Sequence, residues 1–102
     1  MDLSQKEWTE NLLKGLNTVV LDVRTADEFA DGKIENAINI DIYRGQGFIY
    51  EADALDKTKS YYVYCKAGGR SAQACSIMKD LGFEKTYNLA GGIMNWKGAI
   101  IK

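Results

Sequence analysis

Short apolar runs recur along the chain and are separated by amphipathic stretches. Three of the runs are rich in β-branched or aromatic residues, and all are too short for helices: Val19–Leu21, Ala37–Ile40 and Tyr61–Tyr64. A fourth strand is predicted at Lys85–Leu89. Val19–Leu21 is apolar throughout rather than alternating, which favours a strand that is buried on both faces, as in a parallel sheet.

The first amphipathic stretch predicts a helix over Ser4–Lys14. Trp8, Leu12 and Leu16 recur at four-residue spacing, which places them on one helical face. Ser4 followed three residues later by Glu7 fits a capping box, and Gly15 is a plausible stop signal.

Two further helices follow predicted strands. The first covers Thr25–Gly32, with Thr25 as its cap and Gly32 as its end. The second covers Ser71–Leu81 and ends at Gly82. Its apolar positions fall on one face and are Ala74, Ile77, Met78 and Leu81. A turn at Ala90–Gly92 precedes a short helix at Ile93–Lys97.

The segment Asp41–Asp53 has no clear period. Gly45 and Gly47 interrupt it, and Phe48–Tyr50 fits either a strand or a helix. Ala52–Lys57 is compatible with a helical turn.

Strands that alternate with helices predict an α/β fold with a central parallel sheet and helices on both faces. A length of 102 residues predicts a single domain over residues 1–102. Ligands bind beyond the carboxyl ends of the strands in such folds. Cys65, Arg24 and the Gly91–Gly92 turn all follow strands, so we expect them to converge on that edge.

The composition limits the classes of function that are expected. The net charge is −1 from 13 basic and 14 acidic residues, which predicts neither a nucleic-acid partner nor an anionic membrane partner. The chain has no histidine and two cysteines, too few ligands for a structural zinc site, and no cofactor is expected. The first residues lack the apolar core of a secretory signal, so a cytoplasmic location is expected.

The segment Cys65–Ser71 carries the strongest chemical signal. It joins a nucleophile at a strand end to a glycine-rich turn and two cations. Inward-pointing backbone N–H groups at Gly68 and Gly69, with the start of the next helix, would favour a thiolate. Lys66 and Arg70 would add positive charge if their side chains folded toward the sulfur. On spacing alone, a core cysteine followed by an ordinary turn is an equal alternative.

The neighbouring polar residues have simpler interpretations. Ser71 is interpreted as a helix cap, and Cys75 as a buried, inert thiol on the apolar flank of its helix. Asp22 and Arg24 can form an exposed ion pair, and we favour a structural role in which they brace the neighbouring loop. Lys66 is equally compatible with a surface lysine and with an anion contact.

Four segments resemble one known family. The loop Cys65–Ser71 resembles the active-site loop of single-domain rhodanese-type sulfurtransferases. Leu21–Phe29, with its Asp-x-Arg and Glu-Phe pairs, Gly32–Ile40 and Leu89–Trp96 resemble other family segments in the same order and spacing. Each motif is weak alone, but the four in register cover nearly the whole chain.

The resemblance implies a rhodanese-like three-layer α/β domain with a parallel sheet of four or five strands. It also implies a thiosulfate sulfurtransferase that forms a persulfide on Cys65 and passes the sulfur to a thiol or a protein acceptor. Under this interpretation the anion-binding loop comprises Lys66, Ala67, Gly68, Gly69 and Arg70, and the supporting residues are Asp22, Arg24 and Ser71.

Three alternatives stay open. A cysteine-dependent phosphatase or arsenate reductase would use the same thiolate, but its loop has five residues between Cys and Arg, where this chain has the four from Lys66 to Gly69. A non-catalytic persulfide carrier or docking module would keep the same loop. A redox switch would require Cys65 and Cys75 to lie within disulfide distance.

Overall fold

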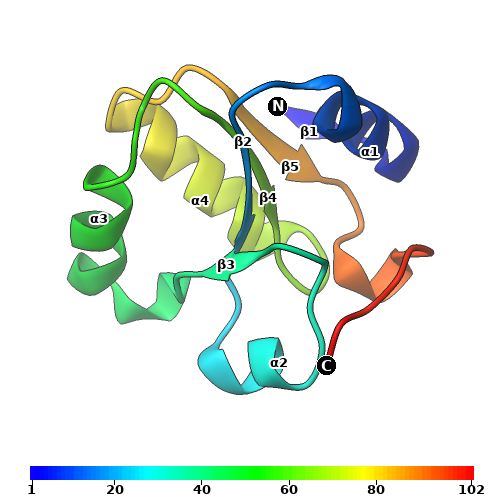
Figure 1. The fold of residues 1–102 in the computed structure, drawn as a ribbon. Coiled ribbons are helices and arrows are strands. Elements are labelled where there is room, and N and C mark those ends of the chain that lie inside the picture. The colour runs from blue at the N-terminus through cyan, green and yellow to red at the C-terminus, as the bar shows by residue number, and fades with distance from the viewer.

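A five-stranded parallel sheet forms the centre of the molecule (Figure 1). The computed structural model describes all of residues 1–102. The strands lie in the order β1-β5-β4-β2-β3, and every neighbouring pair is parallel. Their bounds are Asp2–Leu3 (β1), Thr18–Asp22 (β2), Ile38–Asn39 (β3), Ser60–Tyr64 (β4) and Thr86–Leu89 (β5). The predicted parallel sheet is confirmed, but β1 was missed because two residues carry no periodicity.

Helices cover both faces of this sheet, as predicted. Figure 1 shows α3 and α4 on one side and α1 on the other, with α2 below the carboxyl ends of the strands. The bounds are Gln5–Lys14 (α1), Ala26–Ala30 (α2), Gln46–Asp53 (α3) and Gly69–Asp80 (α4), with 3₁₀ turns at Ile42–Arg44 (η1) and Ile93–Asn95 (η2). None of these helices has the length and apolarity that crossing a bilayer requires.

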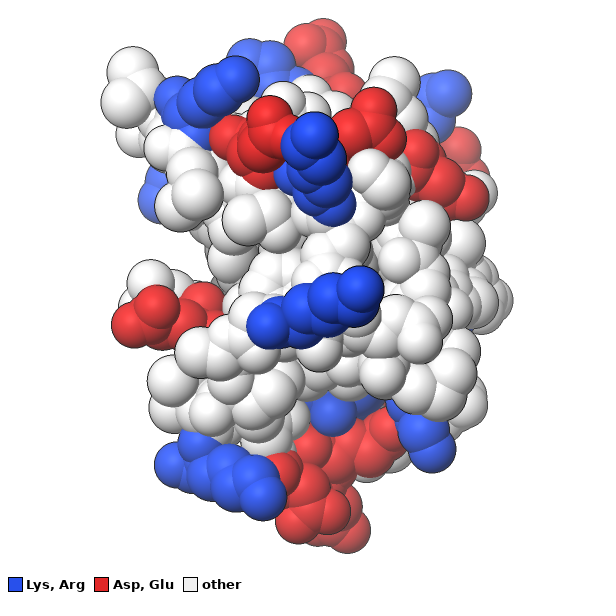
Figure 2. Space-filling view, turned by 90° about the vertical axis from the view of Figure 1, so that its right-hand side faces the viewer, with Lys and Arg blue, Asp and Glu red and all other residues white.

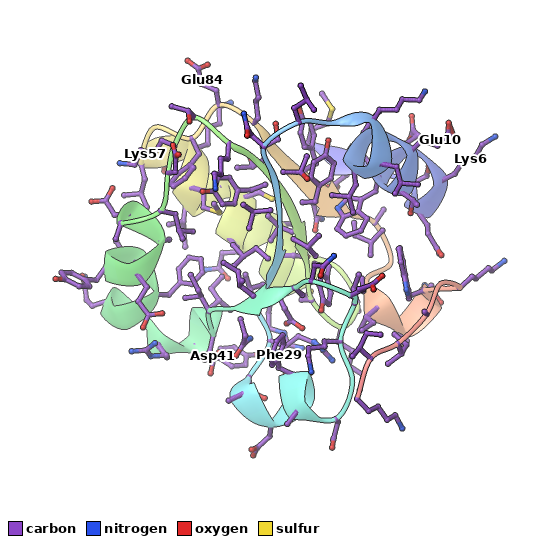
Figure 3. The ribbon with its side chains drawn as sticks, viewed as in Figure 1. Lys6, Glu10, Phe29, Asp41, Lys57 and Glu84 are labelled. Atoms are coloured by element: carbon purple, nitrogen blue, oxygen red, sulfur yellow. The ribbon has the colours of Figure 1, made fainter.

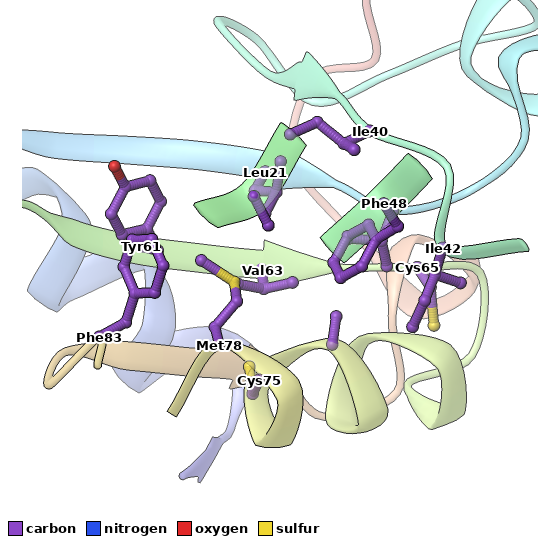
Figure 4. Close-up of a cluster of buried hydrophobic side chains, with 13 residues drawn as sticks. Leu21, Ile40, Ile42, Phe48, Tyr61, Val63, Cys65, Cys75, Met78 and Phe83 are labelled. Atoms are coloured by element: carbon purple, nitrogen blue, oxygen red, sulfur yellow. The ribbon is translucent and has the colours of Figure 1, made fainter. Parts of the chain in front are cut away.

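The alternation of side chains along β2 and β4 divides the core in two. Odd-numbered residues such as Leu21 and Val63 face α3 and α4, where they pack with Phe48 and Met78 (Figure 4). Cys65 continues this odd-numbered series, so its side chain belongs to the same core. The sequence position of the cysteine thus decides which face of the sheet it occupies.

Even-numbered residues of β4 build the second core under α1. Trp8 is fully buried there, and its ring meets Tyr62 and Tyr64 edge-on at centroid distances of 5.7 and 6.4 Å. The indole N–H donates to the Tyr87 carbonyl oxygen at 3.2 Å. Aromatic packing therefore fixes α1 against the sheet.

The ends of α1 follow the predicted signals. Ser4 and Glu7 form the reciprocal capping box, and Gly15 caps the C-terminus. The placement of Leu16 on the apolar face was wrong. The helix stops before it, and Leu16 is 86% exposed.

The segment without a clear period forms η1 followed by α3. Gly45 separates the two elements with a φ of +59°, a backbone conformation that favours glycine. Phe48 and Ala52 are fully buried against the sheet, so the helical alternative holds for Phe48–Tyr50. The segment alone could not decide this, because its glycines hide a short amphipathic period.

The carboxyl ends of β2 and β4 meet at the topological switch point. The chain leaves β2 toward β3 on one side and leaves β4 toward β5 on the other, so the two connections diverge at this point. Phe29 and Asp41 lie at this end of the sheet, while Lys57 and Glu84 lie at the opposite end (Figure 3).

Asp22 and Arg24 form a buried ion pair at the end of β2, so an exposed pair is excluded. Asp22 is fully buried and Arg24 is 6% exposed. Arg24 Nη2 donates to Asp22 Oδ2 at 2.6 Å and to the Gly32 carbonyl oxygen at 2.6 Å. Its guanidinium also lies 5.6 Å from the centroid of the Tyr64 ring. The pair therefore braces the segment after α2 against β2 and β4.

Removing one member of this pair should be costly. We expect Arg24→Met to lower the free energy of unfolding by about 3–5 kcal/mol, because the Asp22 carboxylate would stay buried without its partner. Arg44→Met, which breaks the exposed pair with Glu51, should cost less than about 1 kcal/mol. Denaturant unfolding measures both, and equal losses would contradict the structural role.

Candidate active site

Cys65 follows β4 directly and lies on the floor of the loop that leads into α4. Its side chain is only 1% exposed, whereas Lys66 and Ala67 above it are exposed. The Gly68 N–H donates to Cys65 Sγ at 3.0 Å, and the Ser71 hydroxyl donates to the same atom at 3.2 Å. A buried sulfur therefore faces hydrogen-bond donors from the first turn of a helix.

These donors control the ionisation of the thiol. Burial is the largest single influence and opposes the thiolate, but the Ser71 hydroxyl and the backbone N–H groups of Ser71, Gly68 and Ala67 together outweigh it. The pKa of Cys65 consequently lies below its ordinary value. The predicted inward N–H is present at Gly68, where φ is +109°, whereas the Gly69 N–H makes no hydrogen bond to Cys65.

Ser71 does not cap α4, in contrast to the sequence interpretation. The N-cap is Gly68, and Ser71 lies fully buried inside the first turn. The Gly68 carbonyl oxygen already accepts from the Ala72 N–H at 3.1 Å and from Asn88 Nδ2 at 3.2 Å. The Ser71 hydroxyl also lies 3.2 Å from this carbonyl oxygen. Because the oxygen has two lone pairs and both already accept hydrogen bonds, the single hydroxyl hydrogen is available to the sulfur.

Asn88 is a supporting residue that the sequence did not reveal. It lies in β5 and is 3% exposed. Its amide group donates to the Gly68 carbonyl oxygen and to Asp2 Oδ1 at 2.9 Å. β5 thus holds the carbonyl oxygen of Gly68, while the N–H of the same residue points at Cys65. No motif signals this contact, because the two residues lie 20 positions apart.

The Gly91–Gly92 turn packs directly on the cysteine loop, which fulfils the expected convergence. The Ile93 N–H donates to the Cys65 carbonyl oxygen and the Met94 N–H to the Lys66 carbonyl oxygen, both at 2.9 Å. A Cβ on Gly92 would lie 2.3 Å from the Lys66 oxygen. Glycine is required there because the two backbones touch.

The two loop cations differ from the expectation. Arg70 pairs with Glu28 through Nη1–Oε1 at 2.7 Å and Nη2–Oε2 at 2.9 Å, and its guanidinium lies 5.4 Å from the centroid of the Tyr43 ring. Lys66 is exposed and takes part in no ion pair. Hydrogen bonds are the main cause that lowers the pKa of Cys65, and the charge of Arg70 makes a smaller contribution.

Arg24 reaches the site only through neighbouring residues. It stacks on Tyr64, the residue before Cys65, and the Tyr64 hydroxyl accepts from the Ile34 N–H at 3.1 Å. The Val23 N–H donates to the Tyr64 carbonyl oxygen at 3.1 Å. The brace therefore fixes the strand end from which the cysteine projects.

Cys75 is buried like Cys65, but the acidity of its thiol differs. Burial raises its pKa to about 11, and it lies within the apolar core under α4. The predicted burial of this thiol is confirmed. Both cysteines are free.

On the face that carries α1 and η2, acidic and basic side chains are interspersed and form no continuous cationic area (Figure 2). That face therefore offers no long-range attraction for an anion. The cysteine loop provides a thiol whose ionisation is favoured by nearby donors, and the same donors can hold an anion on the sulfur.

Comparison with known proteins gives a consistent result. A model of the rhodanese-like domain matches residues 5–99. A Bacillus subtilis protein named "Putative sulfurtransferase YtwF" is 40% identical over 79 residues, which are 78% of this chain and 73% of that protein. A solved rhodanese-related protein from Thermoplasma volcanium is 30% identical, with a TM-score of 0.81 over 98% of this chain and 96% of that one.

A longer relative carries a different name. The tRNA uridine(34) hydroxylase of Legionella pneumophila is 34% identical over 101 residues, 96% of this chain. The chain spans only 39% of that protein's length. The shared region therefore corresponds to a part of the hydroxylase.

The hydrogen bond from Ser71 should be measurable in the acidity of Cys65. We expect the alkylation rate of Cys65 to rise with pH around a midpoint below the roughly 8.5 of an ordinary cysteine. Ser71→Ala should move this midpoint upward, because the thiolate loses a donor while its burial stays. Mass spectrometry of iodoacetamide-treated peptides separates Cys65 from Cys75.

Ser76→Ala is the matched control for that substitution. Ser76 lies on the exposed side of the same helix, so its removal should leave the midpoint unchanged. An identical midpoint in Ser71→Ala and the unsubstituted protein would contradict the role of the hydroxyl.

Gly92 provides a test of the backbone contact. Gly92→Ala should displace the loop and raise the alkylation midpoint of Cys65, since its Cβ would overlap the Lys66 backbone. Gly45→Ala imposes a similar strain at φ +59°, but nothing lies within 4 Å of its Cβ. It should cost about 1–3 kcal/mol of stability with no change in the midpoint. If the midpoint shifts in both variants, lost stability rather than the loop contact explains the effect.

Proposed function

Because the chain belongs to the rhodanese-like domain family of sulfurtransferases, we propose that it transfers a sulfane sulfur through a persulfide on Cys65. The donor is thiosulfate or a similar compound, and the acceptor is a thiol or another thiophilic group. The observation that carries this proposal is the environment of the sulfur. Cys65 is almost fully buried, yet its pKa is lowered by donors from Ser71 and Gly68.

The first step needs no proton transfer. The Cys65 thiolate attacks the sulfane sulfur of thiosulfate, a new S–S bond forms, and the original S–S bond breaks. The electron pair of the broken bond leaves with sulfite, which is a stable anion. The absence of histidine from the chain is compatible with this step, because neither a general base nor a general acid is required.

The second step returns the enzyme to its starting state. An acceptor nucleophile attacks the outer sulfur of the persulfide, and the Cys65 thiolate is the leaving group. The same donors that stabilise the thiolate would stabilise it as it departs. The Gly68 and Ala67 N–H groups would hold the persulfide between the two steps. A covalent intermediate of this kind predicts ping-pong kinetics.

The size of the loop supports sulfur over phosphate or arsenate. Four residues separate Cys65 from Arg70, one fewer than in cysteine-dependent phosphatases and arsenate reductases. Arg70 also forms an ion pair with Glu28, so its guanidinium is not free to bind an oxyanion. A persulfide carrier that serves a partner protein uses the same intermediate, and only turnover distinguishes it from an enzyme.

The proposed partners are small sulfur compounds and an acceptor thiol, which a second protein can supply. The free state of both cysteines supports a reducing compartment such as the cytoplasm. We do not propose tRNA hydroxylation, because more than half of the length of the Legionella pneumophila hydroxylase has no counterpart in this chain.

The persulfide can be detected directly. Incubation with thiosulfate, followed by removal of excess donor without reductant, should increase the intact mass by one sulfur atom. Cyanide should remove this sulfur as thiocyanate, because cyanide attacks the outer sulfur atom. Intact-protein mass spectrometry and thiocyanate assay measure the two steps.

Two substitutions locate the sulfur. Cys65→Ser should abolish the adduct, whereas Cys75→Ser should retain it. If every donor forms the adduct but neither cyanide nor a thiol accepts its sulfur, the result would favour a carrier. No adduct with thiosulfate, an organic persulfide or polysulfide would overturn the proposal.

A further inference from the structure

The Glu28–Arg70 pair joins α2 to the first turn of α4 beside the cysteine loop. Both oxygens of the carboxylate are engaged, at 2.7 and 2.9 Å from the two guanidinium nitrogens. The side chains are 19% exposed for Arg70 and 30% for Glu28. Such a bidentate pair is stronger than an ordinary surface contact, because its geometry matches two parallel hydrogen bonds.

Glu28 is also held in place from its own helix. The Thr25 N–H and hydroxyl donate to Glu28 Oε1 at 3.1 and 3.2 Å, as part of the capping box of α2. On the other side, the Tyr43 ring packs against the Arg70 guanidinium. The carboxylate therefore stays against Arg70 without losing further side-chain freedom.

The pair changes the charge that a substrate meets at the loop. Lys66 and Arg70 together would present two positive charges, but Glu28 cancels one of them. Hydrogen bonding to Arg70 is the main reason that the pKa of Glu28 is lowered to about 2, so the carboxylate stays ionised at any working pH. Only another anion or a substitution can release Arg70.

We propose that Glu28 is a specificity-determining residue that weakens binding of dianionic donors and favours low-charge donors, namely organic persulfides and organic polysulfides. A dianion such as thiosulfate must either compete with Glu28 for Arg70 or bind to Lys66 and the loop N–H groups while close to a carboxylate. A donor of the form R–S–SH meets neither cost. This inference rests on the proposed sulfur transfer and names its preferred substrate class.

The step with an organic persulfide balances without an additional reactant. The Cys65 thiolate attacks the outer sulfur of R–S–SH and forms a new S–S bond, while the bond between the two donor sulfurs breaks. The electron pair leaves with R–S⁻, and the proton stays on the transferred sulfur. The donor brings no second negative charge beside Glu28, and the only charge that develops on it is that of the departing R–S⁻.

Glu28→Gln tests the inference with little structural change. Glutamine can still complete the capping box with Thr25, so α2 should keep its cap while the negative charge is lost. We expect kcat/KM for thiosulfate to rise about five- to tenfold. The value for a neutral organic persulfide should change less than about twofold, so the ratio between the donors is the readout.

Asp53→Asn is the matched control. It removes the same charge from an exposed pair with Lys57, which lies at the opposite end of the sheet (Figure 3). The ratio between donors should stay unchanged in this variant. In the double variant Glu28→Gln, Arg70→Met, the gain for thiosulfate should disappear, because no guanidinium is left to release.

The outcomes separate this inference from the proposed function. If the unsubstituted protein forms no persulfide with either donor, the sulfur-transfer proposal fails. If both donors form the persulfide but Glu28→Gln leaves their ratio unchanged, sulfur transfer stands and the inference about Glu28 is overturned. If the gain in kcat/KM for thiosulfate persists in the double variant, the inference about Glu28 is also overturned, because Arg70 would not be the released group.

Discussion

A sulfur atom that is buried among apolar side chains carries a negative charge only if hydrogen-bond donors replace the water it has lost. In this protein the Gly68 N–H and the Ser71 hydroxyl are those donors. The rest of the site depends on their position, since burial alone would raise the pKa of the thiol, as it does at Cys75. Two cysteines in one core thus have opposite chemistry because only one of them follows a strand and faces the first turn of a helix.

The fold holds these donors from several directions. β5 fixes the Gly68 carbonyl oxygen through Asn88, and the turn after β5 donates two backbone N–H groups to the carbonyl oxygens of Cys65 and Lys66. The buried pair of Asp22 and Arg24 stabilises the adjacent strand end. Donors fixed in this way need little reorganisation when charge leaves or returns to the sulfur, which is the physical basis of preorganised electrostatic catalysis.

Only one of the two positive charges of the cysteine loop is unpaired. A site with two free cations would attract every small anion, whereas the Glu28–Arg70 pair leaves Lys66 as the unpaired cation of the loop. The pair also connects α2 with α4, so one contact links the packing of the helices to the electrostatics of the nucleophile. On the face that carries α1 and η2, acidic and basic side chains are likewise interspersed.

The sequence by itself determined the parallel α/β fold, the helix caps at Ser4 and Thr25, and the cysteine loop, because these depend on local periodicity and on residues within a few positions. It could not resolve β1 or α3, whose signals are too short or are interrupted by glycine. Only the tertiary structure decided that Ser71 faces the sulfur, that Asn88 holds Gly68, and that Glu28 neutralises Arg70 across 42 positions. Such contacts depend on how strands and helices meet in space, and no spacing along the chain encodes them.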